Sequence, residues 1–171
     1  AKDLLGKYFT DDIAISDYKE GDQKLPYIIK KEFIGNDING VNYEQLFQYQ
    51  QPEDGDAFRV ILADFVTTED GTGIVHIAPS FGADDNLVAK QNGIGSLTLV
   101  DDQGRFLEVV NDLSGQFVRQ EYYSDGDIKP KYPTDIQIVI NLKNKDQLFK
   151  SEKYEHSYPH CWRTDKPILY Y

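Results

Sequence analysis

The chain has 171 residues, 40% of them hydrophobic, which is enough for one domain with its own core and excludes a disordered or fibrous protein. Its 18 basic and 29 acidic residues give a net charge of −11, which excludes nucleic-acid binding by general neutralisation of phosphates. A single cysteine, Cys161, excludes an internal disulfide framework. No apolar run approaches the roughly 18 residues of a membrane span, and no signal peptide is evident, so we expect a cytoplasmic protein without a membrane contact.

The amino-terminal quarter is polar and rich in turn-forming residues. The chain opens abruptly on AKDLLGKYF and contains no methionine, so we expect it to be an excised piece of a longer polypeptide. Short apolar runs alternate with turn signals such as Asn39-Gly40. This alternation predicts short strands joined by turns.

Two buried strands and a helix are predicted around the middle of the chain. Phe58–Val66 is rich in β-branched and aromatic residues, and Gly73–Ile77 is a second strand-like run. The helix is predicted over Ala83–Asn92. Carboxylates at its start and Lys90 near its end complement the helix dipole, and Gly93 is placed to end it.

The second half of the chain mixes both kinds of element. Leu97–Val100 and Phe106–Val110 predict a strand pair around a glycine turn. Asp135–Leu142 is ambiguous. Its isoleucines alternate as in a strand, yet it follows Pro133-Thr134, a plausible helix start, and it could present one apolar helical face. The elements together predict an α+β fold dominated by short strands.

The stretch GTGIVHIAPSFGADD, Gly71–Asp85, contains the candidate chemistry. It lacks a third glycine and a Walker lysine and leads into a strand, which argues against a phosphate-binding loop. The spacing of His76, Asp84 and Asp85 fits no zinc motif, so we expect no metal. These residues could orient a substrate. They could equally be structural, since carboxylates at a helix start stabilise the helix dipole.

Three motifs in the same order resemble isoleucyl-tRNA synthetases. DFVTTEDGTGIVHIAPSFGADD, at Asp64–Asp85, resembles their editing domain, and GNDINGVNYEQLF, at Gly35–Phe47, is similar to an earlier segment of it. The tail YEHSYPHCWRTDKPILYY, at Tyr154–Tyr171, resembles the strand that leads from the inserted connective polypeptide back to the synthetic domain. Its histidine-cysteine-tryptophan-arginine run favours the isoleucyl family over its valyl and leucyl relatives.

The resemblance implies a fold. Residues 1–171 would form a single, partial editing domain, with 154–171 as the neck strand. The expected fold class is α+β and β-rich: the distorted β-barrel of the class I synthetase editing domain, with peripheral helices and an amino-terminal truncation.

The resemblance also implies a function. The parent would join isoleucine to tRNA(Ile) with ATP and Mg²⁺ in its synthetic domain. The known figure for isoleucyl-tRNA synthetase is that its synthetic pocket separates isoleucine from valine by only about 150-fold. The editing domain would therefore hydrolyse valyl-tRNA(Ile) and valyl-adenylate, without a cofactor of its own. Its partners would be the mischarged tRNA 3′ end and the remainder of the synthetase.

Site residues follow from the same resemblance. Asp85 would be the catalytic residue, holding the α-ammonium of the misattached amino acid through a charge-assisted hydrogen bond and so placing the ester for a bound water. His76 would line the amino-acid pocket and reject isoleucine by its bulk. The other substrate-binding residues would approach the terminal adenosine or form the neighbouring wall; they are Gly71, Thr72, Gly73, Ala78, Pro79, Ser80 and Phe81.

The chain also departs from the family pattern. Nothing in residues 1–60 resembles the threonine-rich segment that forms the other wall of the pocket. An alternative is therefore a module that binds the aminoacylated 3′ end without hydrolysing it. Thr164 stands where some relatives carry a zinc-binding cysteine, so we expect no zinc and expect Cys161 and Trp162 to pack at the neck. Asn86 replaces a larger residue, and the sequence assigns it no role.

Overall fold

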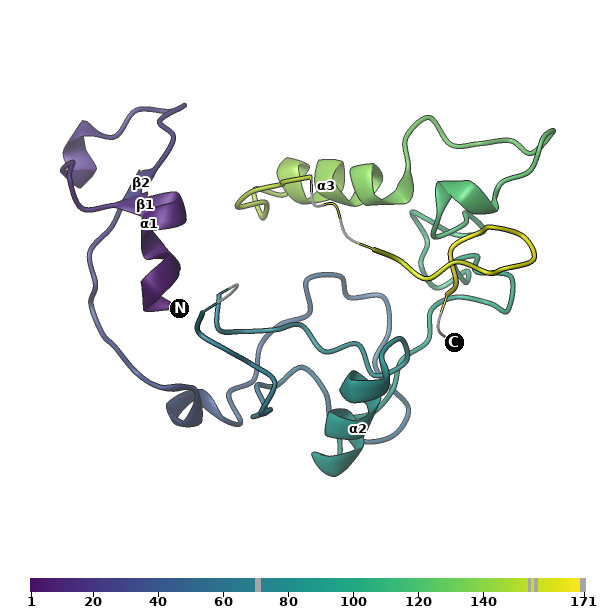
Figure 1. Ribbon diagram of the computed structural model, residues 1–171, viewed down its shortest axis with the longest axis horizontal. Coiled ribbons are helices and arrows are strands. Elements are labelled where there is room, and N and C mark those ends of the chain that lie inside the picture. Colours follow the sequence, from purple (N-terminus) through teal and green to yellow (C-terminus); the bar gives the residue numbers. More distant parts are fainter. Residues whose placement is uncertain (70–71, 154, 156, 170–171) are drawn as a thin grey trace.

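Figure 1 shows the computed structural model of the chain, which describes residues 1–69, 72–153, 155 and 157–169. The α-helices are α1 (Leu5–Tyr8), α2 (Ala83–Gln91) and α3 (Thr134–Asn144), and the strands are β1 (Phe9–Thr10) and β2 (Leu25–Pro26). Short 3-10 helices lie at Lys2–Leu4, Ile15–Asp17, Gly35–Ile38 and Gln120–Tyr122. The chain follows an open arc from α1 past α2 to α3 (Figure 1). No helix in these described ranges has the length and hydrophobicity needed to cross a bilayer.

The predicted helix over residues 83–92 is confirmed as α2. Asp84 and Asp85 lie in its first turn and Lys90 in its last, so both ends complement the helix dipole. Asn92 caps the carboxyl end, and its backbone N–H donates to the carbonyl oxygens of the preceding turn. Gly93 has φ +66°, in the left-handed region where a glycine ends a helix at no steric cost.

The ambiguous segment 135–142 is helical and forms most of α3. Its start is fixed by tertiary contacts: Thr134, which is 6% exposed, donates its hydroxyl to the carbonyl oxygen of Phe117 at 2.9 Å. The Gln137 amide donates to Gln116 Oε1 at 2.7 Å and to the Tyr132 carbonyl at 2.9 Å. These bonds favour the helical alternative over the strand.

The predicted strand 58–66 pairs only at its beginning. It runs antiparallel to residues 40–43: the Val60 N–H donates to the Val41 carbonyl and the Tyr43 N–H to the Phe58 carbonyl, each at 2.8 Å. Beyond Val60 the chain turns at residues 64–65, and neither over 61–66 nor over 73–77 does it form a strand with other described residues. A regular strand is therefore wrong for 61–66 and 73–77 in this structure, because a strand needs a partner to supply its ladder hydrogen bonds.

The predicted pair around the glycine turn at 101–104 is confirmed in part. Val100 and Phe106 form an antiparallel bridge, and the Leu107 N–H donates to the Leu99 carbonyl at 3.0 Å. The chain then turns, with the Val110 N–H donating to the Leu107 carbonyl at 3.0 Å, so residues 108–110 do not continue the strand.

The fold class is confirmed as α+β only in its coarse form. The named strands, β1 and β2, form a two-stranded parallel sheet in which Phe9 pairs with Leu25 and Thr10 with Pro26. This sheet is not closed, so the distorted β-barrel stays a prediction.

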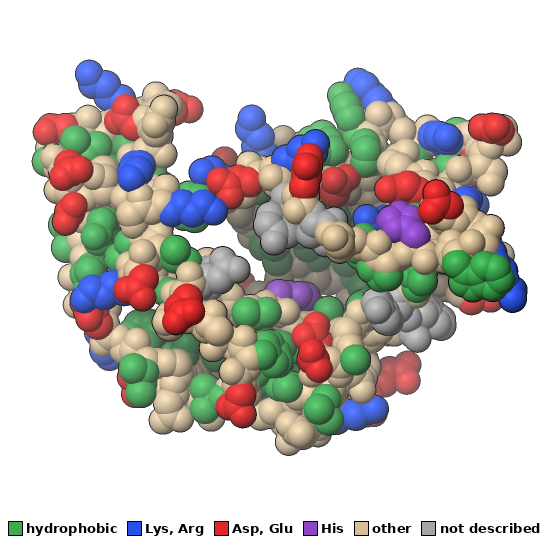
Figure 2. Space-filling view, in the orientation of Figure 1, with side chains coloured by type: hydrophobic (Ala, Val, Ile, Leu, Met, Phe, Trp, Pro, Cys, Tyr) green, Lys and Arg blue, Asp and Glu red, His purple; other side chains and the backbone are tan. Residues whose placement is uncertain are grey.

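The buried core lies mainly in the second half of the chain. Its apolar members are Ala89, Val100, Val110, Leu113, Phe117 and Tyr123. The Tyr123 ring packs edge-on against Phe117 in this core, with ring centroids 4.9 Å apart. The Tyr123 hydroxyl accepts a hydrogen bond from the Phe117 N–H at 3.1 Å. Figure 2 shows that hydrophobic side chains are also scattered among acidic ones on the visible face.

Adjacent valines offer a matched test of this core. Val110 is 1% exposed, whereas Val109 is 37% exposed. Val110→Ala removes buried methyl groups and leaves a cavity, so we expect it to lower the free energy of unfolding by about 2 kcal/mol. Val109→Ala should change it by less than about 0.5 kcal/mol. Urea denaturation followed by circular dichroism would measure both, and equal effects would contradict the assignment of the core.

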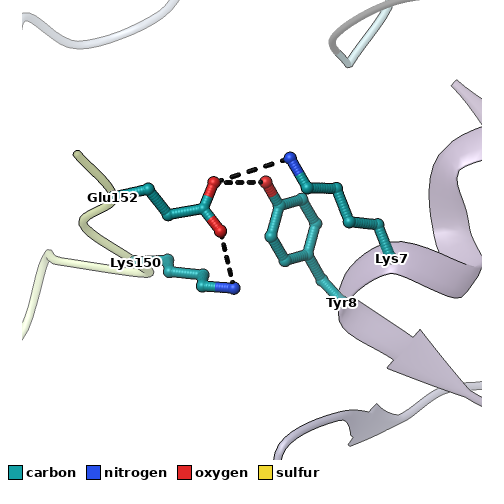
Figure 3. A network of polar contacts seen from close by, with 4 residues as sticks. All are labelled: Lys7, Tyr8, Lys150 and Glu152. Carbon is teal, nitrogen blue, oxygen red and sulfur yellow. Dashed lines mark hydrogen bonds and ion pairs between the residues drawn. The ribbon is translucent and has the colours of Figure 1, made fainter. Parts of the chain in front are cut away.

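A contact between distant parts of the chain closes one side of the arc. Glu152 Oε2 accepts hydrogen bonds from Tyr8 Oη at 3.1 Å and Lys7 Nζ at 3.5 Å, and its Oε1 lies 2.9 Å from Lys150 Nζ (Figure 3). Lys150 is the first cause of the lowered pKa of Glu152, and Tyr8 is the second. Phe149 packs edge-on to Tyr8 beside this network, with ring centroids 6.0 Å apart. Because the ion pairs are exposed, the ring contact is the more stabilising part.

Candidate functional site

The candidate residues lie on a loop that leads into α2. The chain is extended from Ile74 to Ile77 and then turns, with the Phe81 N–H donating to the Ala78 carbonyl at 2.9 Å. Gly82 precedes the helix as its N-cap residue, and the Asn86 N–H donates to the Gly82 carbonyl at 2.8 Å. The loop therefore brings its turn, Ala78–Phe81, over the amino-terminal end of α2.

Asp85 folds back from the helix onto this loop. It is half-buried, and its Oδ2 accepts a hydrogen bond from the Ala78 N–H at 3.0 Å. A Cβ placed on Gly82 would lie only 3.0 Å from the same oxygen, so the absence of a side chain there makes room for the carboxylate. Oδ1 has no hydrogen-bond partner among the described residues. One oxygen is thus held by the backbone, and the other makes no such bond within the described ranges.

The two adjacent carboxylates have different surroundings. Asp84 is exposed and its side chain makes no hydrogen bond with the described residues, so stabilisation of the helix dipole accounts for it. Asp85 is half-buried and bonded to the loop. Asp85 therefore has a carboxylate oxygen fixed by the loop, whereas Asp84 acts only on the helix dipole.

Asn86 is a site-positioning residue that the sequence did not reveal. Its Nδ2 donates to the Pro79 carbonyl at 2.9 Å, beside the bond from Ala78 to Asp85. Two consecutive residues of α2 thus hold two consecutive residues of the turn. The short side chain of Asn86 reaches this carbonyl. The only sign of this role in the sequence was an asparagine directly after the two aspartates.

The turn residues form a half-buried surface above the helix end. Ala78, Pro79, Ser80 and Phe81 are all half-buried. The Ser80 Oγ is inaccessible to solvent and lacks a hydrogen-bond partner among the described residues. These residues lie on the turn whose Ala78 N–H bonds Asp85, and their role as a wall of the pocket stays a prediction.

The structure does not bring His76 to Asp85 through a hydrogen bond or an ion pair between described residues. His76 is exposed on the extended segment, and its neighbours Ile74 and Val75 are 64% and 51% exposed. An exposed imidazole on an extended segment can contact a ligand side chain without first being desolvated. Its role as a size filter stays a prediction.

The glycine-threonine turn is described in part, because Gly71 lies outside the described residues. The Thr72 Oγ1 donates to the Ile74 carbonyl at 2.9 Å. Gly73 has φ +80°, which favours glycine, and the terminal ammonium of Ala1 donates to the Thr72 carbonyl. The turn thus lies against the start of the chain, and contact with an adenosine stays a prediction.

Comparison with known proteins supports the resemblance. No family model matches the chain. The isoleucine–tRNA ligase of Cytophaga hutchinsonii is 50% identical over 193 residues, covering 100% of this chain and 17% of that protein. The corresponding ligase of Bacteroides fragilis is 42% identical over 200 residues, again covering 100% and 17%, and that of Clostridium tetani is 42% identical over 168 residues, covering 98% and 14%. The chain is related to a segment of the isoleucine–tRNA ligases.

The match covers all of this chain but only a small part of each ligase. This chain is covered along its whole length, yet it spans only 17% of the Cytophaga hutchinsonii and Bacteroides fragilis ligases. The activity and substrates of a whole ligase can therefore only be proposed for this chain.

The ligase-like tail forms a small hairpin around Cys161. His160 pairs with Pro167, and the Cys161 N–H donates to the Lys166 carbonyl at 2.8 Å. The pKa of the Cys161 thiol is lowered, first by a hydrogen bond with the Thr164 side chain. Trp162 is 85% exposed beside the Arg163 guanidinium, so it does not pack against the described residues, and its packing at the neck stays a prediction. Within that part of the chain, no three metal-binding side chains cluster.

Proposed function

We propose that this chain is part of the editing region of an isoleucine–tRNA ligase, which hydrolyses valyl-tRNA(Ile) and valyl-adenylate. The parent would carry out ATP-dependent aminoacylation of tRNA(Ile) in the cytoplasm, with ATP and Mg²⁺ serving its synthetic part. The observation that carries the proposal is Asp85, half-buried over the turn, with Oδ2 held by the Ala78 N–H and Oδ1 without a partner among described residues.

The proposed reaction is hydrolysis of an ester. The α-ammonium of the misattached valine donates to Asp85, which fixes the ester carbonyl relative to the turn. A water oxygen adds to the carbonyl carbon, and the bond from that carbon to the ribose oxygen breaks. The ribose oxygen takes one proton of the water and becomes the free hydroxyl of tRNA, while the other proton passes to solvent and valine leaves as its carboxylate. No cofactor is needed for this exchange.

The chemistry of the turn supports this assignment. A carboxylate aimed by a backbone N–H keeps a fixed direction, which is needed to place an ammonium group. His76 would meet the side chain of the amino acid. Because Asp85 lies in the first turn of α2 and His76 on the preceding loop, one can bind the common backbone of the amino acids while the other distinguishes their side chains.

A second candidate is binding of the aminoacylated 3′ end without hydrolysis. It is favoured by the openness of the site: His76 is exposed, and its neighbours Ile74 and Val75 are 64% and 51% exposed. A surface of this kind can hold a ligand without excluding bulk water or orienting one water molecule. The isolated chain would then bind, and a longer polypeptide would hydrolyse.

Deacylation assays distinguish the two candidates. Valyl-tRNA(Ile) would be incubated with the 171-residue chain and with a chain extended at its amino end, and release of labelled valine would be followed. We expect hydrolysis by the extended chain and binding without hydrolysis by the shorter one. Isoleucyl-tRNA(Ile) is the control substrate. Absence of valine release from both chains would contradict the editing proposal.

A further inference from the structure

An open groove lies apart from the Asp85 site. Its volume is about 610 Å³, within the usual range for small-ligand sites. It is lined by Phe58 and by residues 43–45 and 48–51. The lining is formed by aromatic rings and glutamine amides, with Glu44 as its acidic member. We call this site the Tyr43 groove.

Two rings of the groove are held together by backbone and side-chain contacts. Tyr43 and Phe58 meet edge-on, with ring centroids 6.2 Å apart and an interplanar angle of 83°. The Tyr43 N–H also donates to the Phe58 carbonyl at 2.8 Å. Tyr43 nevertheless remains 54% exposed, so much of its ring is free to meet a ligand.

Phe58 adopts an unusual backbone conformation in the wall of this groove. Its φ is +54°, in the left-handed region that bulky residues rarely occupy. Strain of this kind is kept mainly where a side chain must be aimed for a function. Here it holds the Phe58 ring against Tyr43 at the groove.

Some glutamine side chains of the groove are hydrogen-bonded within the loop, and others have no partner among the described residues. The Gln45 Nε2 donates to the Gln50 carbonyl at 3.0 Å, and its Oε1 accepts from Gln51, so the loop is tied internally. The side chains of Gln48 and Gln50 have no hydrogen-bond partner among the described residues. Each free amide presents a donor and an acceptor side by side, the pattern that pairs with the edge of a nucleobase.

The rest of the loop is anchored to α3 and its neighbours. The Tyr49 hydroxyl donates to Asp112 at 2.6 Å, and Asn141 of α3 donates to the other oxygen of that carboxylate at 3.2 Å. Burial, and then Asp112, raise the pKa of Tyr49, so this hydroxyl stays a donor. Tyr49 also stacks on Phe47, with ring centroids 5.8 Å apart. The groove is therefore preformed on one side.

From these features we propose that the Tyr43 groove binds an unpaired nucleobase of a single-stranded tRNA 3′ end. The base stacks on Tyr43, and the free amides of Gln48 and Gln50 bond to its edge. Aromatic side chains with open faces are the usual platforms for unpaired bases. The inference rests on the proposed function, since it assumes that the aminoacylated 3′ end is the ligand.

Helix α2 relates the groove to the candidate site. Asp56 and Arg59, next to Phe58, are fastened to the carboxyl end of α2: the Asp56 N–H donates to the Gly93 carbonyl at 2.9 Å, and Arg59 donates to the Asn92 carbonyl. Asp85 lies at the opposite end of the helix. The nine residues of α2 span about 13 Å, so the helix places the Asp56–Arg59 attachment and Asp85 near its two ends. We expect one single strand to reach both, with its terminus at Asp85 and an upstream base in the groove.

The charges near the groove favour contact with the base over contact with phosphate. Glu44 lines the groove, and the nearby Arg59 is paired with Asp56 at 2.8 Å. Lys145 of the α3 carboxyl end lies over the Phe47 ring, 5.5 Å from its centroid, beyond the groove lining. Binding in the groove should therefore depend only weakly on salt.

A binding experiment on the full 171-residue chain tests the proposal. The probe is a fluorescently labelled single-stranded RNA ending in CCA, and anisotropy gives Kd. Tyr43→Ala should weaken binding about tenfold, Tyr43→Phe should retain it, and Gln48→Ala should weaken it less than Tyr43→Ala. Tyr18→Ala, at another exposed tyrosine, is the matched control and should change nothing.

Probes that lack single bases separate stacking from misfolding. Removing the base that occupies the groove should weaken binding to the wild-type chain and abolish the difference between wild type and Tyr43→Ala. A tenfold loss that persists with every abasic probe, or no loss in Tyr43→Ala, would overturn the proposal. If Tyr43→Ala weakens binding while Asp85→Ala leaves deacylation unchanged, the groove stands and the editing assignment fails; the reverse result overturns only the groove.

Discussion

Replacing Asp85 by alanine in a ligase that contains this segment should lower the rate of valyl-tRNA(Ile) deacylation by at least about 100-fold. The variant removes both the charge that would hold the α-ammonium and the oxygen that accepts the Ala78 N–H. Without either, the ester is not fixed relative to the turn, and a water molecule no longer meets it in a productive geometry. Release of labelled valine from charged tRNA measures the effect, and isoleucine activation should be unchanged.

Asp84 and a conservative variant serve as controls for this result. Asp84→Ala should have little effect on deacylation, because Asp84 is exposed and makes no hydrogen bond with described residues. Asp85→Asn keeps an oxygen that can accept the Ala78 N–H while it removes the charge. If Asp85→Asn retained near wild-type deacylation, the carboxylate would have only a structural role in holding the turn.

Local sequence signals predicted α2 well because its ends are defined by nearby residues. Carboxylates in the first turn, Lys90 in the last and Gly93 beyond it act within a few residues of the helix. The segment now seen as α3 could not be decided in this way. Its helical state depends on Thr134 bonding to Phe117, a residue 17 positions away in the sequence.

The strands were harder to predict because their partners are distant in sequence. Residues 58–60 find a partner at 40–43, whereas 61–66 and 73–77 pair with no described segment. β-branched composition indicates that a segment suits a sheet, but it does not say whether a partner is present. The parallel pairing of β1 with β2 shows the same limit, since neither two-residue strand has a distinctive sequence.

The candidate site was predictable as a set of residues but not as an arrangement. Composition and spacing could not distinguish Asp85 from Asp84, since both stand in the first turn of one helix, and only the family resemblance singled out Asp85. Their difference comes from the fold of the preceding turn, which brings the Ala78 N–H to one carboxylate only. Asn86 was uninterpretable for the same reason, because its partner is the Pro79 carbonyl on that turn.

Replacing His76 by alanine should let correctly charged isoleucyl-tRNA(Ile) be hydrolysed. If the imidazole limits the space beside the amino-acid side chain, its removal admits the additional methylene of isoleucine. Discrimination of one methylene by an apolar pocket is worth about 10- to 200-fold, so we expect isoleucyl-tRNA(Ile) deacylation to rise by about tenfold or more. The readout is the ratio of the deacylation rates of isoleucyl- and valyl-tRNA(Ile).

Variants of matched size show whether bulk is the property that matters at this position. His76→Phe keeps a ring but removes both nitrogens, so it should still reject isoleucine if His76 acts by size. His160→Ala changes the exposed histidine of the tail hairpin and should leave both deacylation rates unaltered. Because His76 is exposed and makes no hydrogen bond with described residues, its replacement should not disturb the fold. Rejection of isoleucine that survives in His76→Ala would therefore assign the size filter to another part of the pocket.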